Sequence, residues 1–295
     1  PGSGKTSVIV ERTAYMTGEG KIPGSSVLVV TFSRSAAREM KERFLKFTRQ
    51  ASTDVTFGTF HGVFYGILKH AYGLGAGNIL SEEEKYAILK EMTLEYGQEL
   101  TQEGDFQEDV AKEISVVKGN RIALDHYYSS CCPDDVFRQI YTGYQKTLRE
   151  RRKLDFDDML LCCYQLFDRR KDILAAWQNK FQYIMVDEFQ DINHLQYDIV
   201  RMLAKPRDNL FIVGDDDQSI YRFRGANIRN ILSFEETFPG AKVIKLEQNY
   251  RSTKMILDSA NEVIRNNTGR KDKTLWTENE VGERPVFREF SSSFE

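Results

Sequence analysis

The chain has 295 residues, a formal net charge of −3, 41% hydrophobic residues and 29% charged residues. This composition is typical of a globular protein of about two domains; it excludes a wholly disordered chain, and the small net charge excludes a globally basic nucleic-acid binder. No apolar stretch approaches the ~20 residues of a membrane-spanning helix, so we expect no membrane partner, and two vicinal cysteine pairs without zinc-site spacing indicate reduced thiols in a cytoplasmic protein.

The first residues form the string PGSGKT, which matches the end of the phosphate-binding pattern G-x-x-x-x-G-K-[ST]. Gly2, Ser3 and Gly4 let backbone N–H groups point at phosphate oxygens, and a following helix adds its positive N-terminal end. We expect Lys5 to reach the β and γ phosphates of ATP and the Thr6 hydroxyl to bind Mg²⁺. The alternative is a flexible turn. Because the pattern and the strand before it begin earlier, we expect the start to be truncated.

Short apolar runs predict four strands, at Val27–Thr31, Tyr183–Val186, Leu210–Val213 and Val243–Leu246. Three of these runs are continuous rather than alternating, which is typical of strands buried on both faces of a parallel sheet. Helical patterns separate the strands, and the first is marked by apolar residues at helical spacing, namely Ala37, Met40, Phe44 and Phe47. This order predicts a doubly wound α/β fold, a parallel sheet flanked by helices.

Residues from about 81 to 153 are highly charged and helical in pattern, with few strand features. Ser81 followed by three glutamates is typical of a helix start, with an N-cap and acids in the first turn. Since this stretch separates two groups of α/β elements, we expect a helical subdomain inserted into the α/β domain.

Two carboxylates, Asp187 and Glu188, follow the apolar run that ends at Val186. Ligands of open α/β sheets bind beyond the carboxyl ends of the strands. Asp187 is therefore expected to hold Mg²⁺, and Glu188 to orient and deprotonate the attacking water. The alternative is a helix N-cap with an acidic first turn, which accounts for one of the two carboxylates.

Longer strings identify a family. DEFQD at 187–191, VGDDDQSIYRFRGA at 213–226 and LEQNYRS at 246–252 resemble motifs II, III and IV of superfamily 1 DNA helicases of the UvrD/Rep/PcrA type. VTF at 30–32 with AAREM at 36–40, TFH at 59–61 and LDFDDML at 154–160 are similar to further segments of those proteins. The matches stand in family order and cover nearly the whole chain.

The resemblance implies RecA-like ATP-binding domains. Domain 1A would comprise residues 1–80 and 154–245, truncated at its N-terminus, and 81–153 would form the helical subdomain 1B. Residues 246–295 would begin a second RecA-like domain, 2A. The late motifs of 2A have no counterpart in this sequence, so we expect little activity from this segment alone.

The resemblance also assigns roles in the ATP site. Gln218 would couple the nucleotide state to DNA, since an amide can hydrogen-bond both water and a phosphate oxygen. Arg251 would contact the γ phosphate with its planar fork, and Tyr250 would stack near the adenine. The alternatives are a surface glutamine in a turn, a solvated arginine and an aromatic residue at a helix start.

For DNA, Tyr221 and Phe223 offer stacking faces for unpaired bases, and Arg224 offers a phosphate or acid contact. By resemblance, Phe32 would help to form a pocket for a flipped base. The remaining candidates lie in the DNA-contact segments, namely Arg34, Thr59 and His61. Core packing is the alternative for Phe32 and Phe223.

Two basic stretches of the sequence are compatible with more than one role. Residues 34–49 carry six Lys or Arg and two acids, and residues 146–153 carry five and one. Each has a net charge of +4, which suits either the DNA backbone or a solvated helix face.

The sequence therefore predicts an ATP- and Mg²⁺-dependent DNA helicase motor that moves 3′ to 5′ along single-stranded DNA and separates duplex junctions. One alternative is the motor portion of an AddA/RecB-type helicase–nuclease, against which the GDDDQ string argues. The other is a nucleotide- or DNA-binding module without turnover.

Overall fold

A parallel four-stranded sheet forms the centre of the fold, as predicted. The computed structural model describes residues 2–94, 106–221 and 225–289. The strand order is β2-β1-β3-β4, with every pairing parallel. The bounds are β1 Val27–Thr31, β2 Thr56–Thr59, β3 Tyr183–Val186 and β4 Leu210–Ile212.

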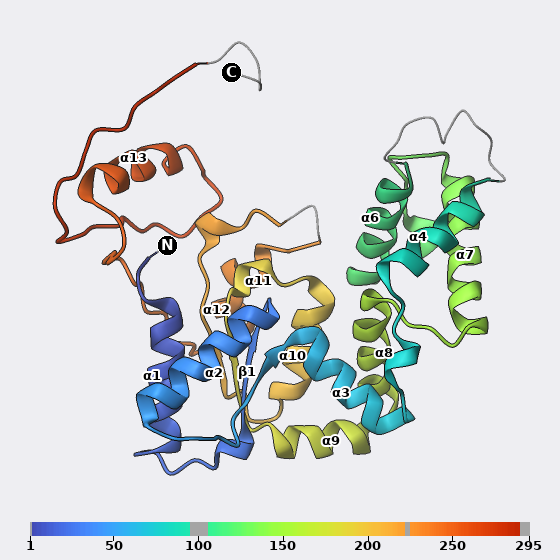
Figure 1. The fold of residues 1–295 in the computed structure, drawn as a ribbon, viewed down its shortest axis with the longest axis horizontal. Helices are drawn as coiled ribbons and strands as arrows, with labels where there is room; N and C mark the ends of the chain where they lie inside the picture. The colour runs from blue at the N-terminus through green and yellow to red at the C-terminus, as the bar shows by residue number, and fades with distance from the viewer. Residues whose placement is uncertain (1, 95–105, 222–224, 290–295) are drawn as a thin grey trace.

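Alternate residues of the central strands face two separate cores. Val27, Val29 and Met185 pack against α1 (Lys5–Thr17) and α2 (Arg34–Thr48). Leu28 and Ile184 pack on the other face, against three longer helices: α3 (Phe60–Tyr72), α8 (Phe156–Arg169) and α10 (His194–Ala204). Helices therefore cover both faces (Figure 1), which confirms the doubly wound α/β class.

Shorter elements complete this domain. Its remaining helices are α9 (Lys171–Lys180), α11 (Arg229–Leu232) and α12 (Phe234–Thr237). Single 3₁₀ turns of this domain lie at Gly24–Ser26, Ala76–Asn78, Phe189–Asp191 and Asp216–Gln218, and another, at Leu124–His126, lies in the helical insertion. Across the described ranges, we find no helix that is both long enough and apolar enough to span a membrane.

The predicted helical insertion is a lobe with its own core, at the right of Figure 1. Its helices are α4 (Glu82–Thr93), α6 (Phe106–Gly119) and α7 (Asp134–Glu150). The Ser81 side chain accepts a hydrogen bond from Glu84 N and the Glu84 carboxylate accepts one from Ser81 N, so α4 starts with the expected cap. The chain leaves and re-enters the sheet domain at one place, where Ile79 forms a bridge with Leu154.

A buried ion cluster ties this insertion to α8. The Lys118 ammonium, at the end of α6, is fully buried; it lies 2.6 Å from Asp155 Oδ2 and 2.8 Å from Asp158 Oδ1. The Tyr144 hydroxyl of α7 donates to Asp155 Oδ2 at 2.9 Å. Burial acts to lower the pKa of Lys118, but the two carboxylates overcome it and raise that pKa. The lysine therefore stays charged and holds the two lobes together.

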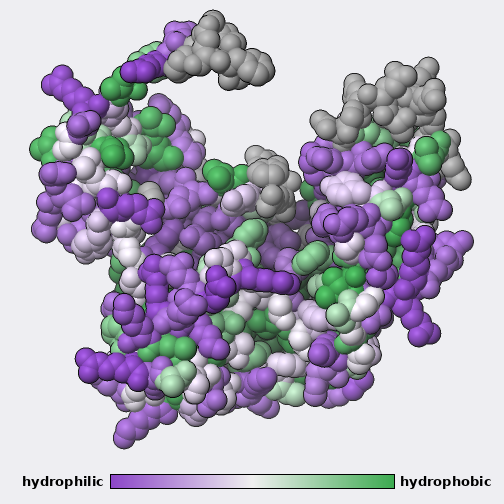
Figure 2. Space-filling view, in the orientation of Figure 1, coloured by the Kyte–Doolittle hydropathy of each residue, from purple (hydrophilic) through white to green (hydrophobic). Residues whose placement is uncertain are grey.

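The C-terminal part of the chain is mostly extended. It contains α13 (Lys254–Ile264), and Gln248 forms a bridge with Trp276. The space-filling view shows the molecule hollowed between this part and the helical insertion (Figure 2). The residues just before α1 contact this C-terminal part: Tyr250 N donates to Gly2 O at 2.9 Å.

The structure differs from the sequence analysis at three places. Val243–Leu246 forms no strand: Val243 and Ile244 are exposed, and a cavity of about 620 Å³ lies between this segment and β4. Without a pairing partner an apolar run cannot join a sheet. Strand β2 was not predicted, since Gly58 interrupts its short pattern. Phe47 is exposed, although Ala37, Met40 and Phe44, which share its helical spacing, are buried.

Candidate functional site

The phosphate loop has the geometry of an anion cradle. Gly2 and Gly4 have φ values of 71° and 79°, the left-handed region that glycine adopts most easily. Helix α1 starts at Lys5 with no side-chain cap and no acid in its first turn. A Cβ at Gly2 would lie 2.6 Å from Asn249 Nδ2, so only glycine fits there. The open N–H groups of Lys5, Thr6 and their neighbours suit phosphate oxygens.

Lys5 faces acids from two strands. Its ammonium lies 3.5 Å from Glu188 Oε2, beyond β3, and 4.0 Å from Asp215 Oδ2, beyond β4. Parallel pairing of β3 with β4 brings these carboxyl ends to the same edge of the sheet, where the α1 N-terminus also lies. The arrangement places a cation between two carboxylates at the mouth of the phosphate loop.

Asp187 fits a cation ligand. It is 4% exposed, and within the described part of the chain its Oδ1 atom has no hydrogen-bond partner. Burial, and then the charge of Glu188, raise its pKa to about 6. A hard cation such as Mg²⁺ would satisfy this orphaned oxygen.

Glu188 and Gln218 occupy defined positions around Lys5. Glu188 has a left-handed φ of 49°, and its side chain is 37% exposed, so solvent reaches the carboxylate. Gln218 ends a 3₁₀ turn, and its amide donates to Asp215 Oδ2 at 2.5 Å.

Tyr250 and Arg251 lie against the loop from the other side. Arg251 Cβ would be 2.9 Å from a Cβ at Gly2, so this arginine is next to the cradle. The Tyr250 ring is exposed, and its hydroxyl donates to Gln248 Oε1 at 2.9 Å. The segment that carries motif IV thus borders the nucleotide loop.

Phe32 and Tyr221 form one aromatic platform. Their ring centroids are 5.7 Å apart with an interplanar angle of 15°, and Phe32 is 42% exposed. Phe32 follows β1 and Tyr221 follows the Asp216–Gln218 turn, so the platform lies at the same edge of the sheet as Glu188 and Asp215. Phe223 and Arg224 lie outside the described residues.

The other DNA candidates differ in exposure. Arg34 begins α2 and is exposed. The Thr59 hydroxyl accepts a hydrogen bond from Gly62 N at 3.1 Å and caps α3. The His61 ring lies edge-on to Phe156, 5.3 Å between centroids; burial lowers its pKa, despite the opposing charges of Asp157 and Asp155. Burial thus favours the neutral form of the His61 ring.

Comparison with known proteins identifies the family. Residues 1–239 match the model of the UvrD/REP helicase N-terminal domain, and residues 244–295 match that of the UvrD-like helicase C-terminal domain. The chain belongs to the UvrD/Rep helicase family.

Relatives within the family are named ATP-dependent DNA helicase PcrA. The chain is 43% identical over 288 residues to the protein of Bacillus subtilis (strain 168), which covers 95% of this chain and 39% of the relative. It is 40% identical over 295 residues to that of Staphylococcus aureus (strain Mu50), covering 96% and 39%. The chain thus spans about two fifths of the length of these relatives.

Gln190 connects two family motifs, and sequence reasoning gave it no role. Its side chain is 1% exposed. Gln190 Nε2 donates to Glu188 Oε2 at 2.9 Å, and its Oε1 accepts from Asp215 N at 2.9 Å. Gln190 therefore fixes the Glu188 carboxylate relative to motif III. The only clue in the sequence was the position of this glutamine within the DEFQD string.

Asn249 is a second residue that the sequence analysis missed. It is 2% exposed, and its Oδ1 accepts hydrogen bonds from Arg251 N and Ser252 N, both at 2.8 Å. These bonds fix the turn that presents Arg251 beside Gly2.

Asp187→Asn is expected to stabilise the nucleotide-free chain. A raised pKa means that folded Asp187 binds its proton more tightly than unfolded Asp187, so its contribution to stability is present below pH ~4 and is lost as the pH rises through about 6. The neutral amide escapes the ionisation cost, which predicts a gain of about 2 kcal/mol in unfolding free energy at pH 7.5. Urea unfolding at pH 7.5 and pH 5 measures it. A gain that does not shrink at pH 5 would contradict the ionisation argument.

Proposed function

We propose that this chain is the motor portion of an ATP-dependent DNA helicase, which couples ATP hydrolysis to 3′-to-5′ movement on single-stranded DNA and to separation of duplex junctions. The observation that carries the proposal is the position of Lys5, at the mouth of a glycine cradle and 3.5 Å from Glu188 Oε2. A phosphate-binding cation and a solvent-reachable carboxylate are the two groups that phosphoryl transfer to water needs side by side.

The loop residues Gly2, Ser3 and Gly4 would surround the phosphates of ATP with backbone N–H groups. Lys5 would leave Glu188 for the β and γ phosphates when the nucleotide enters. Thr6 and Asp187 would hold Mg²⁺, which neutralises charge that develops on the phosphates.

Glu188 would accept a proton from the attacking water, since its carboxylate is held by Gln190 and is still reached by solvent. Gln218 would release Asp215 and turn to the γ phosphate, and Arg251 would meet that phosphate from the motif IV side. Tyr250, with its exposed ring, would stack near the adenine.

For DNA, the platform of Phe32 and Tyr221 would stack unpaired bases, extended by Phe223, with Arg34 and Arg224 at the phosphates. Thr59 and His61 would contact DNA through neutral groups. We propose a cytoplasmic location and no membrane partner for the same protein.

Strand separation with tailed duplexes tests the proposal. A full-length helicase that carries this chain is expected to hydrolyse ATP faster with single-stranded DNA and to unwind duplexes with a 3′ tail but not those with only a 5′ tail. Preference for the 5′ tail would reverse the direction, and DNA-independent ATP turnover without unwinding would refute the motor. No described residue favours the helicase–nuclease, and a nucleotide-binding module without turnover would show binding alone.

Phe32→Ala is expected to weaken single-stranded DNA binding by this chain by ~1–3 kcal/mol, the usual contribution of one base–aromatic stack. Fluorescence anisotropy with labelled oligothymidine measures it. Phe47→Ala is the matched control, because Phe47 is 59% exposed on α2 and is not part of the platform. Equal loss in both variants, or loss of melting temperature in Phe32→Ala, would assign Phe32 to packing.

A further inference from the structure

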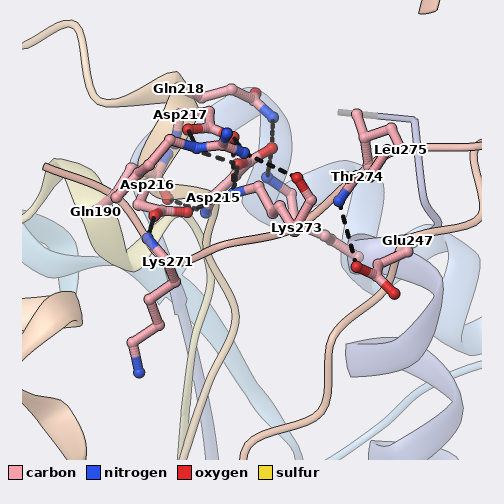
Figure 3. Close-up of polar contacts among 12 residues, drawn as sticks. Gln190, Asp215, Asp216, Asp217, Gln218, Glu247, Lys271, Lys273, Thr274 and Leu275 are labelled. Carbon is pink, nitrogen blue, oxygen red and sulfur yellow. Dashed lines mark hydrogen bonds and ion pairs between the residues drawn. The ribbon is translucent and has the colours of Figure 1, made fainter. Parts of the chain in front are cut away.

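Three consecutive acids after β4 are held by cations from far along the chain (Figure 3). Lys273 Nζ lies 2.6 Å from Asp215 Oδ1 and 3.1 Å from Asp217 Oδ2, and it also pairs with Asp216. Its side chain is 15% exposed. The ammonium therefore occupies the place among the three carboxylates that a cation would take.

Neighbouring residues fix the segment that carries Lys273. Arg270 donates to Asp217 Oδ2 at 2.9 Å, and the backbone N–H of Lys271 donates to Asp216 Oδ2 at 2.6 Å. The Lys271 ammonium pairs with Glu235. These contacts join residues matched by the C-terminal family domain to acids matched by the N-terminal one.

Asp215 connects this cluster to the nucleotide site. One carboxylate oxygen accepts from Lys273, while the other accepts from Gln218 and lies 4.0 Å from Lys5 Nζ. Burial acts to raise the pKa of Asp215, but hydrogen bonds from Lys273 and Gln218 bring it below its usual range. Asp215 is thus a full negative charge close to the lysine that must reach phosphate.

We infer that Lys273 is a positioning residue of the nucleotide site: by neutralising Asp215, it keeps Lys5 available for the phosphates of ATP. The inference rests on the proposed function. Two ammonium groups share the attraction of one carboxylate, and without Lys273 a larger part of that attraction falls on Lys5, at short range in a poorly solvated place. Phosphate must then compete with Asp215 for Lys5.

Lys273→Met is expected to raise the dissociation constant of MgATP about tenfold, equivalent to about 1.4 kcal/mol. Isothermal calorimetry on the 295-residue chain measures it. Lys273→Arg keeps the charge and should stay within about threefold of the parent. The control is Arg270→Met, which removes the pair with Asp217 and the hydrogen bond to the Lys273 carbonyl but keeps the Lys273 ammonium; it should also stay within about threefold.

If Lys273 acts through its charge, a second result is expected. Adding Asp215→Asn to Lys273→Met removes the acid that captures Lys5, so the double variant should bind MgATP within about threefold of the parent. In a full-length helicase that carries the chain, Lys273→Met should raise KM for ATP and change kcat at saturation by less than about threefold.

Other outcomes overturn the inference. A purely structural role for Lys273 would lower the binding stoichiometry or kcat with an unchanged dissociation constant, and the double variant would be no better than the single one. If the parent chain binds MgATP and Lys273→Met binds it equally well, only the inference fails. If neither the parent chain nor a full-length helicase that carries it binds MgATP, the proposed function fails together with the inference.

Discussion

Glu188→Gln, introduced into a full-length helicase that carries this chain, is expected to lower ATP turnover by ~10²–10⁴-fold. The amide cannot accept a proton from water, but it keeps the shape of the carboxylate beside Lys5. ATP affinity should change little, because Gly2 to Thr6 and Asp187 are untouched. Single-turnover hydrolysis and equilibrium ATP binding, measured side by side, separate the two effects.

Glu39→Gln is the control for that experiment, since Glu39 is exposed on α2 and pairs with surface Arg43. It should leave both quantities as they are. Near-normal turnover in Glu188→Gln would remove this carboxylate from proton transfer, and a parallel loss of ATP affinity would make it a binding group instead.

Lys118→Met is expected to cost ~3–5 kcal/mol of unfolding free energy, the usual result of removing one partner from a buried ion pair. Asp155 and Asp158 would be left facing each other without a cation. Burial and the charge of Asp155 already raise the pKa of Asp158 to about 6. Denaturant unfolding at pH 7.5 measures the loss.

Lys112→Met is the matched control on the same helix, because Lys112 is exposed and pairs with Asp109 across one turn; it should cost less than about 1 kcal/mol. Adding Asp158→Asn to Lys118→Met removes one of the stranded charges and should restore part of the stability. A loss no larger than that of the control, or no recovery in the double variant, would show that the buried cluster contributes little.

Local patterns in the sequence were sufficient for most of the fold. Continuous apolar runs predicted β1 and β3 to the residue, and the serine followed by glutamates predicted the start of α4. The two errors in strand prediction have one cause: strand formation depends on pairing with a neighbouring strand. Val243–Leu246 has the composition of a strand, but no strand lies beside it in the described part of the chain, whereas β2 is short and has Gly58 at its centre yet pairs fully with β1.

Where one string of residues carries the expected chemistry, as in the phosphate loop and the acidic pair, the structure brings the predicted residues together. Residues that act through distant partners were not predicted. Gln190, Asn249 and Lys273 are ordinary polar residues in sequence, and their importance comes from contacts across 25 to 58 positions of chain or from complete burial. Composition and spacing do not encode such contacts.

The Ile79–Leu154 bridge bears on how this family could diversify. Leu80 N donates to Leu154 O at 2.9 Å, and Leu154 N donates to Asn78 O at 2.8 Å. The helical insertion, more than seventy residues long, therefore begins and ends at two residues that lie side by side. Lengthening an insertion whose ends are adjacent adds little to the entropic cost of closing it, and it leaves the backbone of the sheet domain where it is. The helical lobe can therefore change in length without disturbing the sheet domain, provided that the contact between Lys118 and the acids of α8 is kept.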